Sequence, residues 1–349
     1  MLNNLTGLRF YTAMWVFIFH LSTEYIKEFN VIFSQKGYLG VDMFFILSGF
    51  ILSYVYFNDL SSSPLTLKKY YNFIIKRFAK IFPLHILSFV LVLILLFVGK
   101  YLFHQSTLRI QLNTIWQNLL MVHAWGTTSE LSWNFPSWSI SAEWFAYLFL
   151  FFSMIFIYRL NKILFYCCGV VLPIIFLSYF LSVKDLSLDS FTYFSFPRII
   201  PEFLIGIMLG FVRLKKNISK GFASFLLLAA ITLFCLIFSF SFFIDSISIL
   251  VFSGIIFSLS YSTYFDFIFS NRVLLYLGNI SFSFYIFQFI SLIIFEESFD
   301  KISAFIKGDM RIFVGFIFVL CINLVLAAAM YQYVEEPIRK KIVKKFIKV

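Results

Sequence analysis

The sequence predicts an all-α membrane protein, a polytopic bundle of about ten transmembrane helices whose N- and C-termini both lie in the cytoplasm. Of its 349 residues, 61% are hydrophobic and only 13% are charged, whereas a soluble chain carries about 25% charged residues. Its apolar runs reach about 20 residues, the length of one helical span, and lack the alternation of barrel strands. This composition excludes a soluble globular enzyme, a nucleic-acid-binding domain and a disordered protein.

The individual spans follow from the apolar runs. The candidates are 10–29, 38–57, 81–99, 137–158, 163–182, 198–212, 222–243, 246–265, 276–295 and 312–333. The loops between them are too short to form a second domain, so residues 1–349 are expected to form a single membrane domain. Residues 334–349 form a basic cytoplasmic tail.

The orientation rests on where the positive charges lie. The net charge is +11, and a cytoplasmic N-terminus places the larger share of Lys and Arg in cytoplasmic segments, as the positive-inside rule requires. The reversed orientation would put the basic tail outside. The charge therefore indicates membrane topology and no nucleic-acid partner. All four Cys lie within spans and no His pair has metal-site spacing, so no metal is expected.

The first span carries two ionisable residues, Arg9 at its inner end and His20 near its middle. Such residues cost about 2.5–3.5 kcal/mol each inside a membrane, so each is a functional candidate. Eleven positions of helix separate them by only about 20° around the axis and about 16 Å along it. One helix face therefore links the cytoplasmic surface to the bilayer interior. A structural His20 bonded to a neighbouring helix is the alternative.

Further polar residues occur near the outer ends of three later spans. Asp42 opens the second span, where Ser48 and Gly49 are expected to serve close helix packing. Glu143 lies about 9 Å inside the fourth span, and Arg198 and Glu202 begin the sixth. These groups are expected to form an outward-opening polar chamber with His20 as its floor.

A basic trio precedes the third span. Lys76 and Lys80 share one helix face at a spacing of four, and Arg77 lies beside Lys80 at a spacing of three. Such a trio suits phosphate groups that arrive from the cytoplasm. The alternative is ordinary positive-inside charge at a membrane boundary.

Several short motifs run in order along the whole chain. They are Arg9 and His20 at R-x10-H spacing, GVDMFFILSGF at 40–50, KRFAKIFP at 76–83, WSISAEWF at 138–145, RIIPEFLIG at 198–206, GNISFSFYIFQ at 278–288 and EEP at 335–337. With these motifs the chain resembles the integral-membrane acyltransferase family 3, which includes bacterial surface-polysaccharide O-acetyltransferases. Three features depart from the family: Lys at 76 and 80 where Arg is usual, Gln288 where many members have His, and no hydrolase-like domain after the last span.

The resemblance implies a multi-pass enzyme of the bacterial inner membrane. It would transfer an acetyl group from cytoplasmic acetyl-CoA, its co-substrate, to a sugar hydroxyl of a surface polysaccharide such as lipopolysaccharide O-antigen or capsule. His20 would act as general base or as a transient acyl carrier. Asp42 and Glu143 would bind acceptor hydroxyls or hold His20. Arg9, Lys76, Arg77 and Lys80 would bind the coenzyme A phosphates, and the substrate-binding set would be Trp138, Ser139, Arg198, Glu202 and Tyr285.

Three other interpretations remain open at this point. A flippase or transporter of a lipid-linked saccharide would use the same residues to line a path, although neither repeats nor paired broken helices are visible. A non-catalytic scaffold would leave Arg9, His20, Asp42 and Glu143 unexplained. Within the enzyme class, the acyl group could be larger than acetyl, or the acceptor could be a small molecule.

Overall fold

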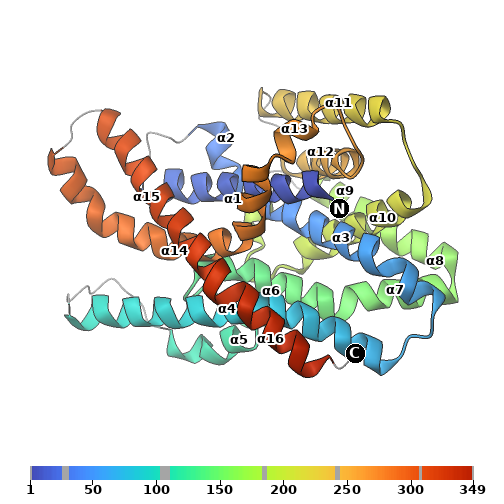
Figure 1. The fold of residues 1–349 in the computed structure, drawn as a ribbon, viewed down its shortest axis with the longest axis horizontal. Coiled ribbons are helices and arrows are strands. Elements are labelled where there is room, and N and C mark those ends of the chain that lie inside the picture. The colour runs from blue at the N-terminus through green and yellow to red at the C-terminus, as the bar shows by residue number, and fades with distance from the viewer. Residues whose placement is uncertain are drawn as a thin grey trace.

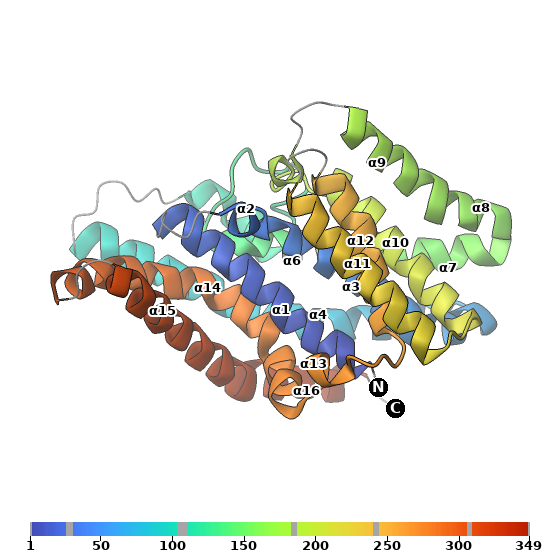
Figure 2. The same cartoon turned by 90° about the horizontal axis from the view of Figure 1, so that it is seen from above.

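The described part of the chain is a bundle of helices. The computed structural model describes residues 2–25, 31–102, 111–182, 187–239, 244–305 and 309–347. Within these residues no β-strand occurs, and the one isolated antiparallel bridge joins Trp125 and Phe194. Figure 1 shows the helices packed side by side, and Figure 2 shows both chain ends on the same side of the bundle. The prediction of an all-α fold is confirmed.

Seven helices of the described chain are long and apolar enough to cross a membrane. They are Gly37–Ser62, Leu67–Gly99, Phe135–Leu160, Lys162–Phe180, Lys220–Phe238, Arg272–Glu296 and Met310–Phe346. The other three expected spans fall on α1 (Asn3–His20), α10 (Phe196–Lys215) and α12 (Ile244–Leu259). The count of ten and the cytoplasmic placement of the termini stay predictions. Parts of the expected segments, 26–29, 240–243 and 348–349, lie outside the described residues.

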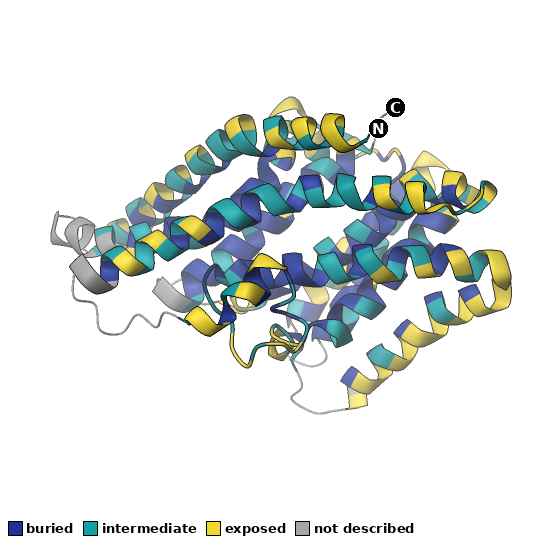
Figure 3. Cartoon of the chain, turned by 90° about the horizontal axis from the view of Figure 1, so that it is seen from below, coloured by how far each residue is buried: buried dark blue, intermediate teal, exposed yellow. Residues whose placement is uncertain are grey.

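The helices differ in how deeply they are buried. In α3 (Gly40–Ser62) 72% of the apolar window is buried, and in α14 (Arg272–Phe305) 67% is, against 22% in α11 (Lys220–Ser239). Figure 3 shows this contrast between the interior of the bundle and its peripheral helices. A helix that faces lipid is apolar all round, whereas polar groups collect where helices face one another. The functional candidates lie on the interior helices for this reason.

The helices α3 and α10 run in parallel with their backbones in contact. A Cβ added at Gly49 would lie 2.2 Å from the Phe203 carbonyl oxygen, and one at Gly206 would lie 2.1 Å from that of Ile46. Only glycine allows this approach, which is how small residues pack membrane helices. The two helices are aligned so that Gly49 meets Gly206. The same alignment brings Asp42 level with Arg198, about two turns earlier on each helix.

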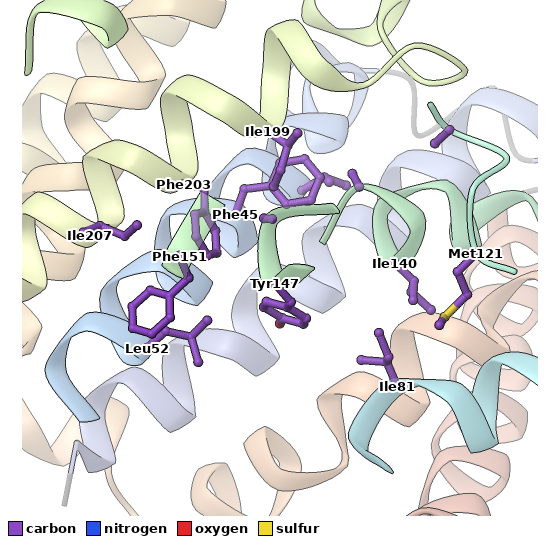
Figure 4. Close-up of a cluster of buried hydrophobic side chains, with 14 of the residues drawn as sticks. Phe45, Leu52, Ile81, Met121, Ile140, Tyr147, Phe151, Ile199, Phe203 and Ile207 are labelled. Carbon is purple, nitrogen blue, oxygen red and sulfur yellow. The ribbon is translucent and has the colours of Figure 1, made fainter. Parts of the chain in front are cut away.

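A large apolar cluster fixes the helices around the candidate site. Figure 4 shows Phe45 of α3 beside Phe203 of α10, and Ile81 of α4 (Leu67–Leu102) beside Ile140 of α6 (Trp138–Phe145), as two parts of one cluster. All four side chains are at most 2% exposed. They hold α3, α4, α6 and α10 at fixed separations, and Tyr147 lies within the same cluster.

In the described ranges, four helical runs widen into single π-helical turns. These turns are Leu21–Tyr25, Ala146–Leu150, Cys167–Val171 and Tyr331–Glu335. A π turn inserts one residue and rotates the rest of the helix about its axis, and such turns are frequent at functional sites. The first turn comes directly after His20, the second comes shortly after Glu143, and the last contains Glu335.

Shorter and peripheral elements complete the bundle. They are α2 (Ile32–Gln35), α5 (Ile115–Leu119), α7 (Phe151–Leu160), α8 (Lys162–Tyr166), α9 (Leu172–Ser182), α13 (Asp266–Phe269), α15 (Asp309–Met330) and α16 (Glu336–Phe346). The expected basic tail is thus helical over most of its length. Pro337 in its first turn and Lys344 and Lys345 in its last suit helix start and end, and α16 packs against α4.

Candidate active site

Two cavities meet at one end of the bundle, and they share three cationic side chains. The inner cavity, of about 190 Å³, lies between α1, α3, α4, α6 and α14. The wider basin, of about 880 Å³, lies between α4 and α16. Arg9, Arg77 and Lys80 line both. These three cations therefore form a wall that the basin and the inner cavity have in common.

The basin is strongly basic. Besides the three shared cations it is lined by Lys76 of α4 and by Arg339, Lys340 and Lys344 of α16, with Glu336 as the acidic side chain among the described lining. Glu336 is held by α16 itself, since Arg339 Nη2 lies 2.6 Å and Lys340 Nζ 3.3 Å from its carboxylate oxygens. The remaining positive charge suits a phosphate-bearing ligand.

Two of the predicted donor-binding residues already have partners. Lys80 forms an ion pair with Glu335, which also accepts a hydrogen bond of 2.6 Å from the Ser283 hydroxyl. Arg77 Nη2 donates to the Tyr56 hydroxyl at 3.3 Å. These contacts fix the direction of both cations toward the shared wall of the two cavities.

Glu143 lies in the wall of the inner cavity. Its carboxylate accepts a hydrogen bond from the Ser48 hydroxyl, and the positive charges of Arg9 and Arg77 act on it. We expected Ser48 to serve packing only. Gly49 serves packing, whereas Ser48 also orients Glu143 from the facing helix.

Asp42 and Arg198 form a fully buried ion pair. Arg198 Nε lies 2.7 Å from Asp42 Oδ1, and Nη2 lies 2.8 Å from Oδ2. The guanidinium also donates to the Tyr38 carbonyl at 2.9 Å and lies over the Trp138 ring at 4.8 Å. Neither side chain of this pair is exposed to solvent. The pair therefore occupies the space where the sequence predicted an outward-opening chamber.

Glu202 is buried beside this pair, with no exposed surface. It lies one turn along α10 from Arg198. Together with Asp42 it places two carboxyl groups around one guanidinium. Three of the predicted chamber residues are therefore brought together, while Glu143 belongs to the inner cavity.

His20 lies at the opposite end of α1 from Arg9 and is 7% exposed. Its ring packs edge-on against Phe135 at 5.2 Å. His20 is not among the side chains that line the inner cavity. The imidazole and the cavity therefore lie along one helix but are separate in this conformation.

A hydroxyl pair lies at the outward end of the inner cavity. The Ser139 and Tyr285 oxygens are 2.9 Å apart, and each donates to the Pro136 carbonyl oxygen, at 3.1 and 3.0 Å. Both side chains line the cavity. The carbonyl that both hydroxyl groups contact belongs to Pro136, the residue after Phe135, whose ring packs against His20.

The sequence did not predict that two histidines would stack on each other. The rings of His85 and His123 stack at 5.9 Å and 6°, although far apart in sequence. Burial and the neighbouring His85 ring lower the pKa of His123, in the segment before α6, to about 3. His85 Nε2 lies 2.7 Å from the Asn118 carbonyl oxygen. The pair thus anchors the segment 111–134 to α4, and no group of three or more metal-ligating side chains occurs in the described ranges.

The predicted residues therefore occupy three neighbouring places. The four donor-binding candidates, Arg9, Lys76, Arg77 and Lys80, all line the basin. Ser139, Tyr285 and Glu143 line the inner cavity, whereas Trp138 is buried under Arg198. The basic residues of α16 were missed as site residues because the positive-inside rule already explained them; the EEP motif at 335–337 was the available signal.

Comparisons with known proteins identify the family of this chain. The family model of the acyltransferase domain, acyltransferase 3, matches residues 2–332. The chain belongs to the acyltransferase 3 family. Acyltransferase MdmB of Streptomyces mycarofaciens is 30% identical over 159 residues, which cover 42% of this chain and 38% of that protein.

Two relatives of this family from Staphylococcus aureus match nearly the whole chain. A provisionally named O-acetyltransferase of strain COL is 26% identical and covers 97% of this chain. The O-acetyltransferase OatA of strain NCTC 8325 is 22% identical and covers 99%. Each match takes in 58% of the relative, so the chain spans about half the length of the curated relatives it matches. No solved structure matches it significantly.

Proposed function

We propose that residues 1–349 form a membrane acyltransferase that moves an acetyl group from cytoplasmic acetyl-CoA to a sugar hydroxyl of a cell-surface polysaccharide. The observation that supports the proposal is a basic basin beside an inner, mostly apolar-lined cavity, with Arg9, Arg77 and Lys80 in the wall that the two share. Coenzyme A has this shape and charge, with phosphates at one end and an uncharged arm at the other. The basin would then face the cytoplasm of a bacterial cell, at the inner membrane.

The donor would bind with its phosphates against the basin. Arg9, Arg77 and Lys76 offer charge-assisted hydrogen bonds, and the basic residues of α16 add to them. Lys residues keep charge but lose the bidentate geometry of Arg, so Arg9 and Arg77 would make the directional contacts. The thioester end would point along α1 toward His20.

Transfer requires a proton to leave the acceptor hydroxyl as its oxygen attacks the thioester carbonyl carbon. A neutral imidazole accepts such a proton near neutral pH, and we assign this role to His20. The carbon–sulfur bond then breaks, and the departing thiolate takes the proton back from His20. In the second version His20 carries the acyl group itself before handing it to the acceptor.

Asp42 and Glu143 would shape the two ends of this path. Glu143, oriented by Ser48, lies where the donor arm passes. Asp42, with Arg198 and Glu202, holds α3 and α10 where the acceptor would approach. The thioester reaches His20 only when the Ser139–Tyr285 hydroxyl pair opens, so donor binding and opening are coupled steps.

The proposal is tested with purified protein in nanodiscs and acetyl-CoA labelled in the acetyl group. Free thiol and label on candidate polysaccharides are followed for wild type, His20→Ala, Arg9→Ala and the matched control His85→Gln. We expect His20→Ala to lower turnover by about 10²–10⁴-fold, the size of a general-base contribution. Arg9→Ala should weaken donor binding, and His85→Gln should turn over normally.

Each contrary outcome has a distinct meaning. Wild-type protein that neither binds donor nor releases thiol with any acceptor would support a transporter of lipid-linked saccharide. Turnover that survives His20→Ala would keep the enzyme and remove His20 from the chemical step. Faster turnover with a longer acyl-CoA would replace acetyl as the transferred group.

A further inference from the structure

Gln288 is a buried amide without a structural task. It lies on α14, has no exposed surface, and neither its Nε2 nor its Oε1 has a hydrogen-bond partner within the described residues. An unsatisfied buried polar group costs about 1–3 kcal/mol, and native proteins keep few of them. A residue that weakens the fold in this way calls for a functional explanation.

Other polar side chains around this part of α14 are paired. The Ser291 hydroxyl lies 3.1 Å from Asn323 Oδ1, and Asn323 Nδ2 donates to the Phe284 carbonyl at 3.2 Å. Asn134 Nδ2 donates to the Ile286 carbonyl at 3.1 Å. These contacts join α14 to α15 and to the segment before α6, and the Gln288 amide takes part in none of them.

The helix geometry shows which way Gln288 faces. Ser281 and Tyr285 of α14 line the inner cavity. Gln288 follows Ser281 by seven positions, so it lies about 20° from the same face and about 10 Å farther along the helix. It therefore faces the line of the inner cavity, beyond the outward end that Tyr285 marks.

His20 lies on the neighbouring helix α1 and, like Gln288, is not among the side chains that line the inner cavity. It shares a face of α1 with Arg9, which lines the same cavity, and lies about 16 Å farther along. The two helices pack directly, since the Phe284 ring lies 5.7 Å from Phe10 and 5.4 Å from Phe17. An imidazole and an unpaired amide thus face the same path from two adjacent helices.

We propose that the side-chain NH₂ of Gln288 donates a hydrogen bond to the carbonyl oxygen of the donor thioester, which rests on the acyl transfer proposed above. As the acceptor oxygen bonds to the carbonyl carbon, an electron pair moves onto the carbonyl oxygen, and the acceptor's proton goes to His20. Gln288 stabilises that negative oxygen until the carbon–sulfur bond breaks and thiolate leaves. A neutral amide suits this task because it donates without competing for the proton.

The test compares Gln288→Met with Gln117→Met. Gln117 is also buried, with an unpaired Oε1, but lies in α5 away from both cavities. Loss of one such donor lowers kcat by about 10²–10³-fold, so we expect this fall in Gln288→Met with the KM for acetyl-CoA unchanged. Its thermal midpoint should stay or rise, because an unpaired amide has been removed. Gln288→His should regain part of kcat through its ring N–H.

Two unreactive donors test the contact itself. Acetonyl-CoA keeps a carbonyl and S-propyl-CoA replaces it by a methylene group. Wild type and Gln117→Met should prefer acetonyl-CoA, and Gln288→Met should lose that preference. Unchanged kcat in Gln288→Met, or equal weakening of both analogues, would overturn the assignment while leaving acyl transfer intact. Wild-type protein without thiol release would overturn the proposed function, and this assignment with it.

Discussion

Arg198 and Asp42 show how single charges are kept inside this bundle. Neither side chain has exposed surface, and two hydrogen bonds of 2.7 and 2.8 Å join them. Two further guanidinium hydrogens donate to the Tyr38 and Leu188 carbonyls, and the Trp138 ring lies over the guanidinium face. Such a pair adds little net stability over apolar residues of the same size. Removal of one partner, however, strongly destabilises the fold, because the other charge stays buried without compensation.

This asymmetry gives the first prediction. Arg198→Met alone should destabilise the protein by about 3–5 kcal/mol, because it leaves the buried Asp42 carboxylate without its cation. Asp42→Leu alone should cost less, because Glu202 stays beside the Arg198 guanidinium. The double variant should recover most of that loss. Thermal unfolding in detergent measures all three, and purely additive losses would show that the two side chains do not depend on each other.

Also at the scale of single residues, the sequence predicted where residues lie along a helix but did not predict which residues of other helices they contact. The sequence predicted that Arg9 and His20 lie on one helix, and both lie on α1, because helical periodicity is local; their shared face stays a prediction. It could not show that Asp42 pairs with Arg198, since partners on different helices are chosen by packing. It also could not reveal the Gln288 amide as unpaired, which requires the position of every neighbour.

At the scale of helices, π turns explain where periodicity fails. One comes after His20, one lies between Glu143 and α7, and one ends at Glu335. Each inserts a residue and changes which face of the next turn is inward. Glu335, the last residue of its π turn, pairs with Lys80. Tyr147 follows Glu143 by four positions, so ordinary helix periodicity already places it on the face that lines the inner cavity.

The close packing of α3 and α10 yields the second prediction. Gly206→Ala would put a Cβ 2.1 Å from the Ile46 carbonyl oxygen, so the helices must separate. Overpacking costs about 1–3 kcal/mol, and we expect a lower thermal midpoint together with lost turnover. The control is Gly221→Ala in α11, where no atom lies within 4 Å. It should be neutral or stabilising by about 0.5–1 kcal/mol; equal effects at both glycines would contradict the packing argument.

For the whole molecule, the two ends of the chain build one site. Arg9 comes from the first helix and Lys340 and Lys344 from the last, and all line the basin with Lys76 and Arg77 of α4. Composition predicted the helical membrane fold because it depends on average hydrophobicity. It did not predict this convergence, because basic residues at a membrane boundary look the same whether or not they surround a cavity.

The third prediction concerns that convergence. Lys340→Gln and Lys344→Gln together should raise the KM for acetyl-CoA about tenfold at low salt and leave kcat unchanged. A tenfold change corresponds to about 1.4 kcal/mol, which is the size of one charge-assisted contact. The effect should shrink as salt rises. Lys345→Gln, the control for Lys344→Gln alone, removes one charge at the next position, where the ammonium lies over Phe346 and outside the basin. If Lys345→Gln raises KM equally, general surface charge and not the basin sets donor affinity.

The contact between α3 and α10 also bears on how the protein is made. Asp42 enters the membrane long before Arg198 is synthesised, and until then the glycine surface of α3 has no helix to meet. The nascent chain must therefore keep α3 within reach of the insertion machinery until α10 emerges. A truncated chain that ends before residue 196 and is released from the ribosome should be rapidly degraded, whereas a released chain that extends beyond residue 215 should persist.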